Sequence, residues 1–178
     1  MKKLTSEQVE LLHEMMAGSL SYQLFLQKID IEIDMELCFN LLLEAKAEND
    51  ASMFRNVLWG LVPQLSYTQK LLLYRMALID QWHHEHEELV QAFQTTYNQE
   101  QENIKYIKII MQHLPGYMAN TVLKDSFIRK CAYAIAAQPT PHKELALNEL
   151  SAGTDAIIVK YALHQLQKIE HSKKSSIE

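Results

Sequence analysis

Apolar residues recur at helical spacing along most of this chain. Thr5 or Ser6 can cap a first helix, because a hydroxyl oxygen accepts the unpaired backbone N–H groups of a first turn. A strongly apolar stretch over residues 21–27 predicts a second helix. The buried face of the first helix is predicted to carry Val9, Leu12, Met15 and Met16.

Residues 29–34 carry a competing signal. Isoleucine and acidic residues alternate there at period two, as in a strand, yet Ile29, Ile33 and Leu37 also share one helical face. A strand needs a partner, and no second clear strand pattern occurs in the sequence. We therefore predict a loop that leads into a helix at Asp34.

The pattern becomes regular after Asp34 and predicts helices joined by short polar turns. The helix that starts at Asp34 is expected to end at a polar run over 44–50, and a later helix is expected to end at Pro115-Gly116. The helix near residues 67–80 is expected to bury a face led by Leu71, Leu72, Met76 and Ile79. The helices expected after residue 50 span about 54–65, 67–80, 84–95, 104–114 and 125–135.

The last pair of helices has the clearest signals. Thr140 is predicted to cap a helix that starts at Pro141, and Thr154 to cap the final helix after a turn at Gly153. The first helix of the pair is expected to bury Leu145, Ala146 and Leu150. The final helix is expected to bury Ile158, Tyr161, Ala162, Leu166 and Ile169.

Residues 140–169 resemble a HEAT repeat. In that family a leucine-rich helix is followed by a polar turn with an aspartate and by a second helix with a valine; Asp155 and Val159 occupy these places, and Lys160 follows the valine. The resemblance implies an all-α fold, a short HEAT-like α-solenoid of antiparallel helix pairs. A compact multi-helix bundle is the alternative. We expect one domain over 1–171 and a flexible polar tail over 172–178.

The composition favours the same fold class. The chain has four glycines and four prolines, whereas average usage would give about 12 and 9 in a chain of this length. Sheets with many turns are hard to build from so few breakers. At 178 residues with 48% hydrophobic content, the chain can form one sizeable core. Cys38 and Cys131 lie in apolar segments and are predicted to be buried free thiols.

Charge and hydropathy limit which classes of partner and which cellular location we expect. The net charge of −5 makes the average surface repel phosphate backbones, so nucleic acid is a disfavoured partner. Polar residues from Ser6 onward interrupt the apolar stretch that an export signal needs. The longest fully apolar run, 131–137, is far shorter than the roughly 20 residues that cross a bilayer. We therefore expect a cytoplasmic protein without a membrane partner.

A histidine-rich segment is the strongest candidate for metal chemistry. If it is helical, His83 and Glu87 fall one turn apart, as do His84 and Glu88, and either pair could hold a divalent metal. The alternative interpretation is a polar helix start, where the helix dipole favours acids. The candidate metal residues are His83, His84, His86, Glu87 and Glu88.

No complete catalytic constellation occurs in the sequence, so we predict no catalytic residue and no cofactor. The leading hypothesis is a non-enzymatic protein- or peptide-binding module, such as a scaffold, an adaptor or a chaperone-like protein. One alternative is a metal-dependent enzyme or sensor that uses the segment from His83 to Glu88. Another is a nucleic-acid-binding helical-repeat protein with a basic stripe of Lys105, Lys108, Lys124, Arg129 and Lys130.

The expected partner surface follows from the HEAT-like resemblance, which implies that second helices line a concave groove. Their non-core positions are mostly basic in a chain that is acidic overall. A groove of this kind suits an acidic peptide or protein segment, while the sequence leaves the oligomeric state open. The predicted partner-binding residues are Arg55, Lys105, Lys108, Arg129, Lys160 and His164.

Overall fold

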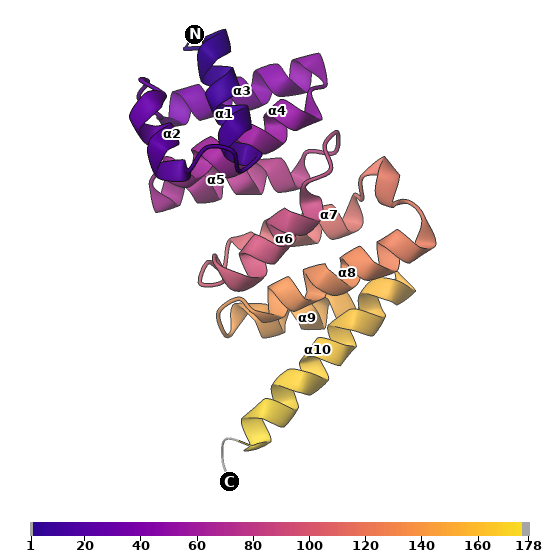
Figure 1. Ribbon diagram of the computed structural model, residues 1–178. Helices are drawn as coiled ribbons and strands as arrows, with labels where there is room; N and C mark the ends of the chain where they lie inside the picture. Colours follow the sequence, from indigo (N-terminus) through magenta and orange to yellow (C-terminus); the bar gives the residue numbers. More distant parts are fainter. Residues whose placement is uncertain (1, 176–178) are drawn as a thin grey trace. The chain divides into compact units, whose positions relative to one another are not determined.

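Helices form all the regular secondary structure in the part of the chain that this computed structural model describes, residues 2–175 (Figure 1). The side chain of Thr121 is outside that description. The predicted all-α class is therefore confirmed. Backbone contacts divide the chain into two compact units. Unit 1 comprises Met1–Tyr74 and Trp82–His84; unit 2 comprises Arg75–Gln81 and Glu85–Glu178.

Unit 1 begins with helices whose starts are set by local capping. The Thr5 hydroxyl accepts a hydrogen bond from the Gln8 N–H, and the Gln8 side chain accepts one from the Thr5 N–H. Ser21 caps the second helix through one bond, because its hydroxyl accepts a hydrogen bond from the Leu24 N–H. The elements of unit 1 are α1 Ser6–Met16, α2 Tyr22–Lys28, α3 Met35–Glu48, α4 Ala51–Asn56, η1 Val57–Leu61, η2 Val62–Gln64 and the first half of α5 Tyr67–Ile79.

The ambiguous segment 29–34 is a loop, as predicted. Asp34 caps α3, and its carboxylate accepts a hydrogen bond of 2.8 Å from the Leu37 N–H. Ile29 is buried at the start of the loop. A single apolar anchor followed by a capping aspartate therefore explains the alternation without a strand.

The helix expected over 54–65 changes its winding twice. It runs as α4, widens to a π-helix in η1 and tightens to a 3₁₀ turn in η2, where Pro63 lies. Gly60 lies in the π segment against α1: a Cβ atom added there would be 2.8 Å from Leu12 Cδ1 and 2.9 Å from Met15 Cε. The change in winding thus coincides with close packing of α1 against the π segment.

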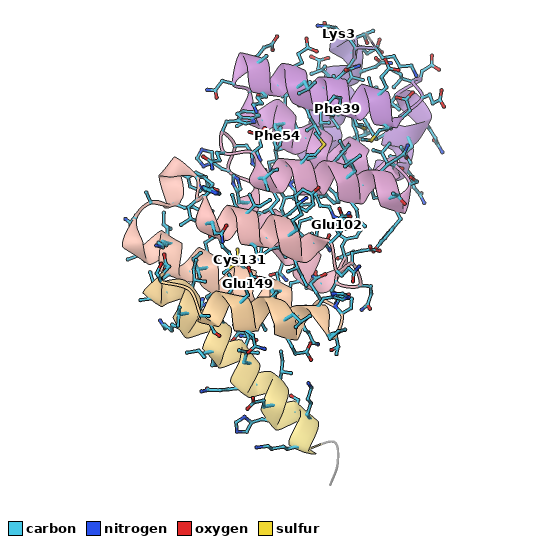
Figure 2. All side chains as sticks on the ribbon, turned by 180° about the vertical axis from the view of Figure 1, so that it is seen from behind. Lys3, Phe39, Phe54, Glu102, Cys131 and Glu149 are labelled. Atoms are coloured by element: carbon cyan, nitrogen blue, oxygen red, sulfur yellow. The ribbon has the colours of Figure 1, made fainter. Side chains whose placement is uncertain are left out.

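The core of unit 1 includes an aromatic cluster around Phe54 (Figure 2). The Phe54 ring stacks on the His83 ring with 4.3 Å between centroids, and Trp82 meets Phe54 edge-on at 5.1 Å. The predicted buried face of α5 was wrong at two positions, because Leu72 and Met76 are 45% and 39% exposed. The buried residues of α5 are Leu71, Leu73, Tyr74, Arg75, Ala77 and Leu78.

Unit 2 contains the rest of α5 and the helices from α6 onward (Figure 1). Two helices of unit 2 begin at other residues than predicted. Helix α6 begins two residues after His84, and α8 begins four residues before Asp125 because Asn120 caps it. The elements that follow α5 are α6 His86–Thr95, α7 Asn103–Gln112, η3 Gly116–Met118, α8 Thr121–Ala136, α9 His142–Ser151 and α10 Ala156–Ser175.

Helix α8 is the centre of unit 2 and packs against α6, α7, α9 and α10. Phe127, Ile128 and Cys131 on its inner face are fully buried. Figure 2 labels Cys131. Both cysteines are buried free thiols, as predicted. Burial raises the pKa of Cys38 to about 12 and that of Cys131 well above its ordinary value. Neither thiol is thus prepared for nucleophilic chemistry.

The last two helices, α9 and α10, lie side by side and are joined by a short turn (Figure 1). Two predicted caps were wrong: α9 follows Pro141 without a side-chain cap, and Asp155 rather than Thr154 caps α10. Residues 172–175 of the predicted tail belong to α10, which runs to Ser175, and 176–178 lie outside the described residues. None of the helices described between residues 2 and 175 is long and apolar enough to cross a membrane.

Candidate functional site

The six basic residues predicted to bind a partner fall in three places. Arg55 is exposed on α4 in unit 1. Lys105 and Lys108 lie on α7, and the remaining three lie on α8 and α10 in unit 2. Five of the six predicted residues therefore belong to unit 2, where they form two subsets, and Arg55 belongs to unit 1.

Lys105 and Lys108 line an open groove of about 590 Å³ between α7 and α9. Its apolar part includes Leu145, which is 63% exposed although the sequence pattern placed it on a buried face. An exposed leucine of this kind is a candidate for partner contact. The complete lining is Gln101, Ile104, Lys105, Lys108, Ile109, Gln112, His142, Leu145, Ala146 and Glu149.

The two lysines of the groove differ in their partners. Lys108 Nζ donates a 2.5 Å hydrogen bond to Glu149 across the groove, from α7 to α9. The Lys105 ammonium lies 5.7 Å from the centre of the Tyr106 ring, and its side chain makes no hydrogen bond or ion pair within residues 2–175. Lys105 is also exposed. One full positive charge is therefore free to meet an anionic ligand.

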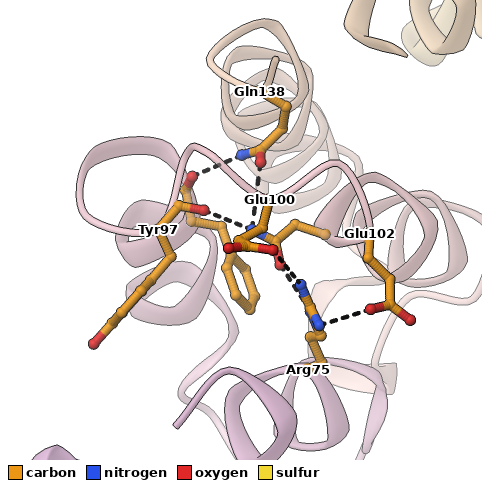
Figure 3. Close-up of polar contacts among 7 residues, drawn as sticks. Arg75, Tyr97, Glu100, Glu102 and Gln138 are labelled. Atoms are coloured by element: carbon orange, nitrogen blue, oxygen red, sulfur yellow. Dashed lines mark hydrogen bonds and ion pairs between the residues drawn. The ribbon is translucent and has the colours of Figure 1, made fainter. Parts of the chain in front are cut away.

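A buried polar network holds the first turn of α7, on which the groove depends (Figure 3). Asn103, the first residue of α7, is fully buried and accepts a 2.8 Å hydrogen bond from Arg75 Nε. Arg75 Nη1 donates a 2.9 Å bond to Glu102. Because Arg75 comes from α5, the network joins the end of α5 to the start of α7.

The same network reaches α8 through Gln138 (Figure 3). Asn103 Nδ2 donates to the Tyr97 carbonyl at 2.6 Å and to Gln138 Oε1 at 3.3 Å. Gln138 Nε2 in turn donates to the carbonyls of Phe93 and Ala134 at 2.8 and 3.0 Å. These bonds satisfy buried polar atoms and fix where α7 starts, so Lys105 and Lys108 are presented at the groove.

The second subset lies on a face formed by α8 and α10. Asp125 accepts hydrogen bonds from the Tyr161 hydroxyl at 2.6 Å and from Lys160 at 3.2 Å, and these bonds lower the pKa of Asp125. His164 lies next to Tyr133, with 6.3 Å between ring centroids. Lys160 is thus engaged with an acid of its own chain, unlike Lys105.

The helical spacing behind the metal prediction is wrong. Helix α6 begins at His86, so His83 and His84 precede the helix and are not one turn from Glu87 and Glu88. Within residues 2–175, no group of three or more His, Cys, Asp or Glu side chains could hold a metal ion. The sequence pattern identified the residue types but could not place the start of the helix.

His86 has structural partners at both ring nitrogens. Nε2 lies 2.7 Å from the Asp80 carbonyl oxygen, which can only accept, so Nε2 carries a proton. Nδ1 lies 2.9 Å from the Tyr117 hydroxyl and accepts from it when the ring is neutral. Glu87 forms an ion pair with Lys130. Two of the predicted metal residues thus hold helices of unit 2 together.

The chain matches no known family model, no curated protein and no solved structure. The class that the structure defines is an all-α protein with an open, partly basic groove in unit 2. The groove and the polar network are therefore the features from which a function can be argued.

Proposed function

We propose that this chain is a protein- or peptide-binding module whose α7–α9 groove takes an acidic segment of a partner protein with an apolar anchor residue. The observation that carries the proposal is the exposed Leu145 in a groove with the free ammonium of Lys105. Such a pairing provides an apolar contact and a charge of defined sign on one surface.

The apolar half of the groove supports binding of a side chain rather than of a free ion. Leu145 is exposed and Ile109 is half-buried, while Ile104 and Ala146 beneath them belong to the core. Covering such surface removes apolar area from water at about 25 cal/mol per Å². The groove volume of about 590 Å³ lies within the range of about 300–1,000 Å³ that is common for ligand sites.

The polar half supports an acidic partner. Lys105 has no acid of its own, and the Glu149 side chain that pairs with Lys108 is 67% exposed. Ion pairs at such exposure contribute about 0–1 kcal/mol, so a ligand carboxylate can take the place of Glu149 at little cost. Two ammonium groups then face the ligand, at an i, i+3 spacing on one helix.

The proposal includes the HEAT-like array and the cytoplasmic location expected from the sequence, and it assigns the groove to α7 and α9. A metal-dependent function loses its support because the helical spacing that motivated it is absent. A nucleic-acid function has no support beyond the separate lysines, in a chain with a net charge of −5.

A peptide-display selection on the full chain tests the proposal without a known partner. We expect selected peptides to combine Asp or Glu with a large apolar residue. The double variant Lys105→Glu/Lys108→Glu should weaken the selected peptide by about tenfold or more, and less so at high salt, because salt screens exposed charges. The matched control is Lys28→Glu/Lys174→Glu, which changes the net charge equally at exposed positions outside the groove.

The apolar part has its own test. Leu145→Ser should weaken the same peptide severalfold at every salt concentration, because it removes apolar contact and no charge. Equal weakening by the control double variant, or unchanged affinity in the groove variants, would show that the groove is not the binding site.

A further inference from the structure

A second pocket of unit 2 has a lining unlike that of the α7–α9 groove. It measures about 250 Å³ and is lined by Gln94 from α6 and by Arg129, Lys130 and Tyr133 from α8. All four side chains carry hydrogen-bond donors, and none is a carboxylate or an apolar group. We call this the α6–α8 pocket.

The donors of the α6–α8 pocket are only partly used within the protein. The Arg129 side chain is exposed and makes no hydrogen bond or ion pair with the residues described. Lys130 uses one bond on Glu87 and keeps two N–H groups. The side-chain amide of Gln94 is half-buried, and its N–H groups make no hydrogen bond with the residues described.

Tyr133 contributes a donor of increased strength. Its hydroxyl oxygen accepts a 2.9 Å hydrogen bond from Lys168, so its own proton remains available to a ligand. The Lys168 ammonium also lies 4.8 Å from the centre of the ring and lowers the pKa of Tyr133. A more acidic hydroxyl donates a stronger bond to an anion.

The size and charge of the pocket select the class of ligand. Its volume is below the roughly 300 Å³ at which sites for small-molecule ligands begin, so it suits a single charged group with part of the arm that carries it. Arg129, Lys130 and Lys168 supply three positive charges. Two negative charges lie near them: Glu87 pairs with Lys130, and Asp125 has its pKa lowered in part by Arg129. A planar guanidinium next to further donors fits an anion with several acceptor oxygens.

We propose that the α6–α8 pocket binds a phosphate monoester group through Arg129, Lys130, Tyr133 and Gln94. A phosphate monoester carries about −1.5 to −2 charges at neutral pH and three acceptor oxygens, which matches this set of donors better than a carboxylate does. The phosphate belongs either to a phosphorylated side chain of a partner or to a free phosphate compound. The site is separate from the α7–α9 groove and does not depend on the function proposed for it.

NMR titration of the full chain with inorganic phosphate, with a short phosphoserine peptide and with its unphosphorylated copy tests the site. We expect saturable shifts at the Gln94 side-chain amide and the Tyr133 ring with both phosphate ligands and none with the unphosphorylated peptide. Arg129→Gln should weaken binding about tenfold or more, since it removes a charge-assisted bond. Lys28→Gln, which removes one positive charge at an exposed position of unit 1, is the matched control and should leave the affinity unchanged.

The outcomes separate the two sources of phosphate. Tighter binding of the phosphoserine peptide than of inorganic phosphate identifies a phosphorylated partner, and equal binding identifies a free phosphate compound; both support the site. Tyr133→Phe, which keeps the ring, should weaken either ligand severalfold. No saturable shift, equal shifts with acetate, or full affinity in a folded Arg129→Gln variant would overturn the proposal.

Discussion

The two units of the chain differ in how their consecutive helices are connected. Unit 1 adapts its backbone: the segment after α4 passes through π and 3₁₀ winding, and Asp30 and Asn49 take positive φ angles of 41° and 56°. In unit 2, no residue other than glycine has a positive φ among the positions described. Its joints depend instead on buried polar side chains, above all on Arg75, Asn103 and Gln138.

This difference predicts which substitutions each unit tolerates without a large loss of stability. Apolar packing around Gly60 involves the flexible ends of Leu12 and Met15, which can move to accommodate a small change. A buried hydrogen-bond network cannot adapt in this way, because each group that loses its partner remains desolvated. Unit 2 should therefore be the more sensitive unit to single polar substitutions, and it also carries both proposed binding sites.

The largest effect is expected from Asn103→Ala. The substitution removes the buried acceptor of the Arg75 Nε–H and the partly buried donor to the Tyr97 carbonyl. We expect it to cost about 3 kcal/mol in the free energy of unfolding, measured by urea denaturation, because it leaves a buried charge short of a partner.

Asn148→Ala is the control for that prediction. Asn148 is exposed on α9 and donates only to the Glu144 carbonyl of its own helix, so its loss should cost well under 1 kcal/mol. If the two variants were equally stable, the network would not be what holds the start of α7.

An intermediate effect is expected at acid pH. A hydrogen bond from Tyr161 lowers the pKa of Asp125, and one from Lys124 lowers the pKa of Asp155. Both folded-state values lie below the ordinary value of 3.8. Their stabilising contribution is therefore complete above that value and is lost as the pH falls through it toward the folded-state pKa.

Melting temperatures measured between neutral pH and about pH 3 test this dependence. The variant Asp125→Asn/Asp155→Asn should melt lower at neutral pH and should lose less on acidification than the natural chain. Glu170→Gln, at an exposed carboxylate with no ion pair among the described residues, should leave the slope unchanged. If the melting temperatures of all three proteins fell equally on acidification, Asp125 and Asp155 would not be the source of the pH dependence.

The smallest effect is expected from Gly60→Ala in unit 1. Alanine gains about 1 kcal/mol over glycine in helix propensity, but its Cβ must displace the ends of Leu12 and Met15. The two contributions oppose each other, so thermal unfolding should show a net change within about 1 kcal/mol.

Gly116→Ala gives the comparison, since an added Cβ there meets nothing within 4 Å. It should not lower the stability of the chain. A loss at Gly60 as large as that of Asn103→Ala would mean that unit 1 is as rigidly determined as unit 2.

Local chemistry in the sequence was enough to predict several features of the fold. Thr5 caps α1 and α3 begins directly after Asp34, both as predicted, because capping depends only on residues within one turn. The buried face of α5 was mispredicted because residues 71–79 are apolar nearly throughout, so no single face stands out. The π segment could not be predicted either, since its winding coincides with a contact from α1.

The candidate site was predictable in part for the same reason. Lys105 and Lys108 were identified as basic positions on one helix, and the structure places both in the groove. Leu145 could not be recognised as exposed, because three apolar residues follow one another at 145–147. Arg75 and Gln138 both contact Asn103, from 28 and 35 positions away along the chain. A local sequence pattern does not contain such long-range contacts.

The most direct test of the binding function is a chemical-shift map of the full chain with a peptide selected by display. We expect the largest shifts on both sides of the groove, at Lys105, Ile109 and Leu145, and much smaller shifts at the same peptide concentration in the Lys105→Glu/Lys108→Glu variant. Shifts confined to other surfaces, or shifts that persist unchanged in that variant, would contradict the assignment of the α7–α9 groove as the site that recognises an acidic partner.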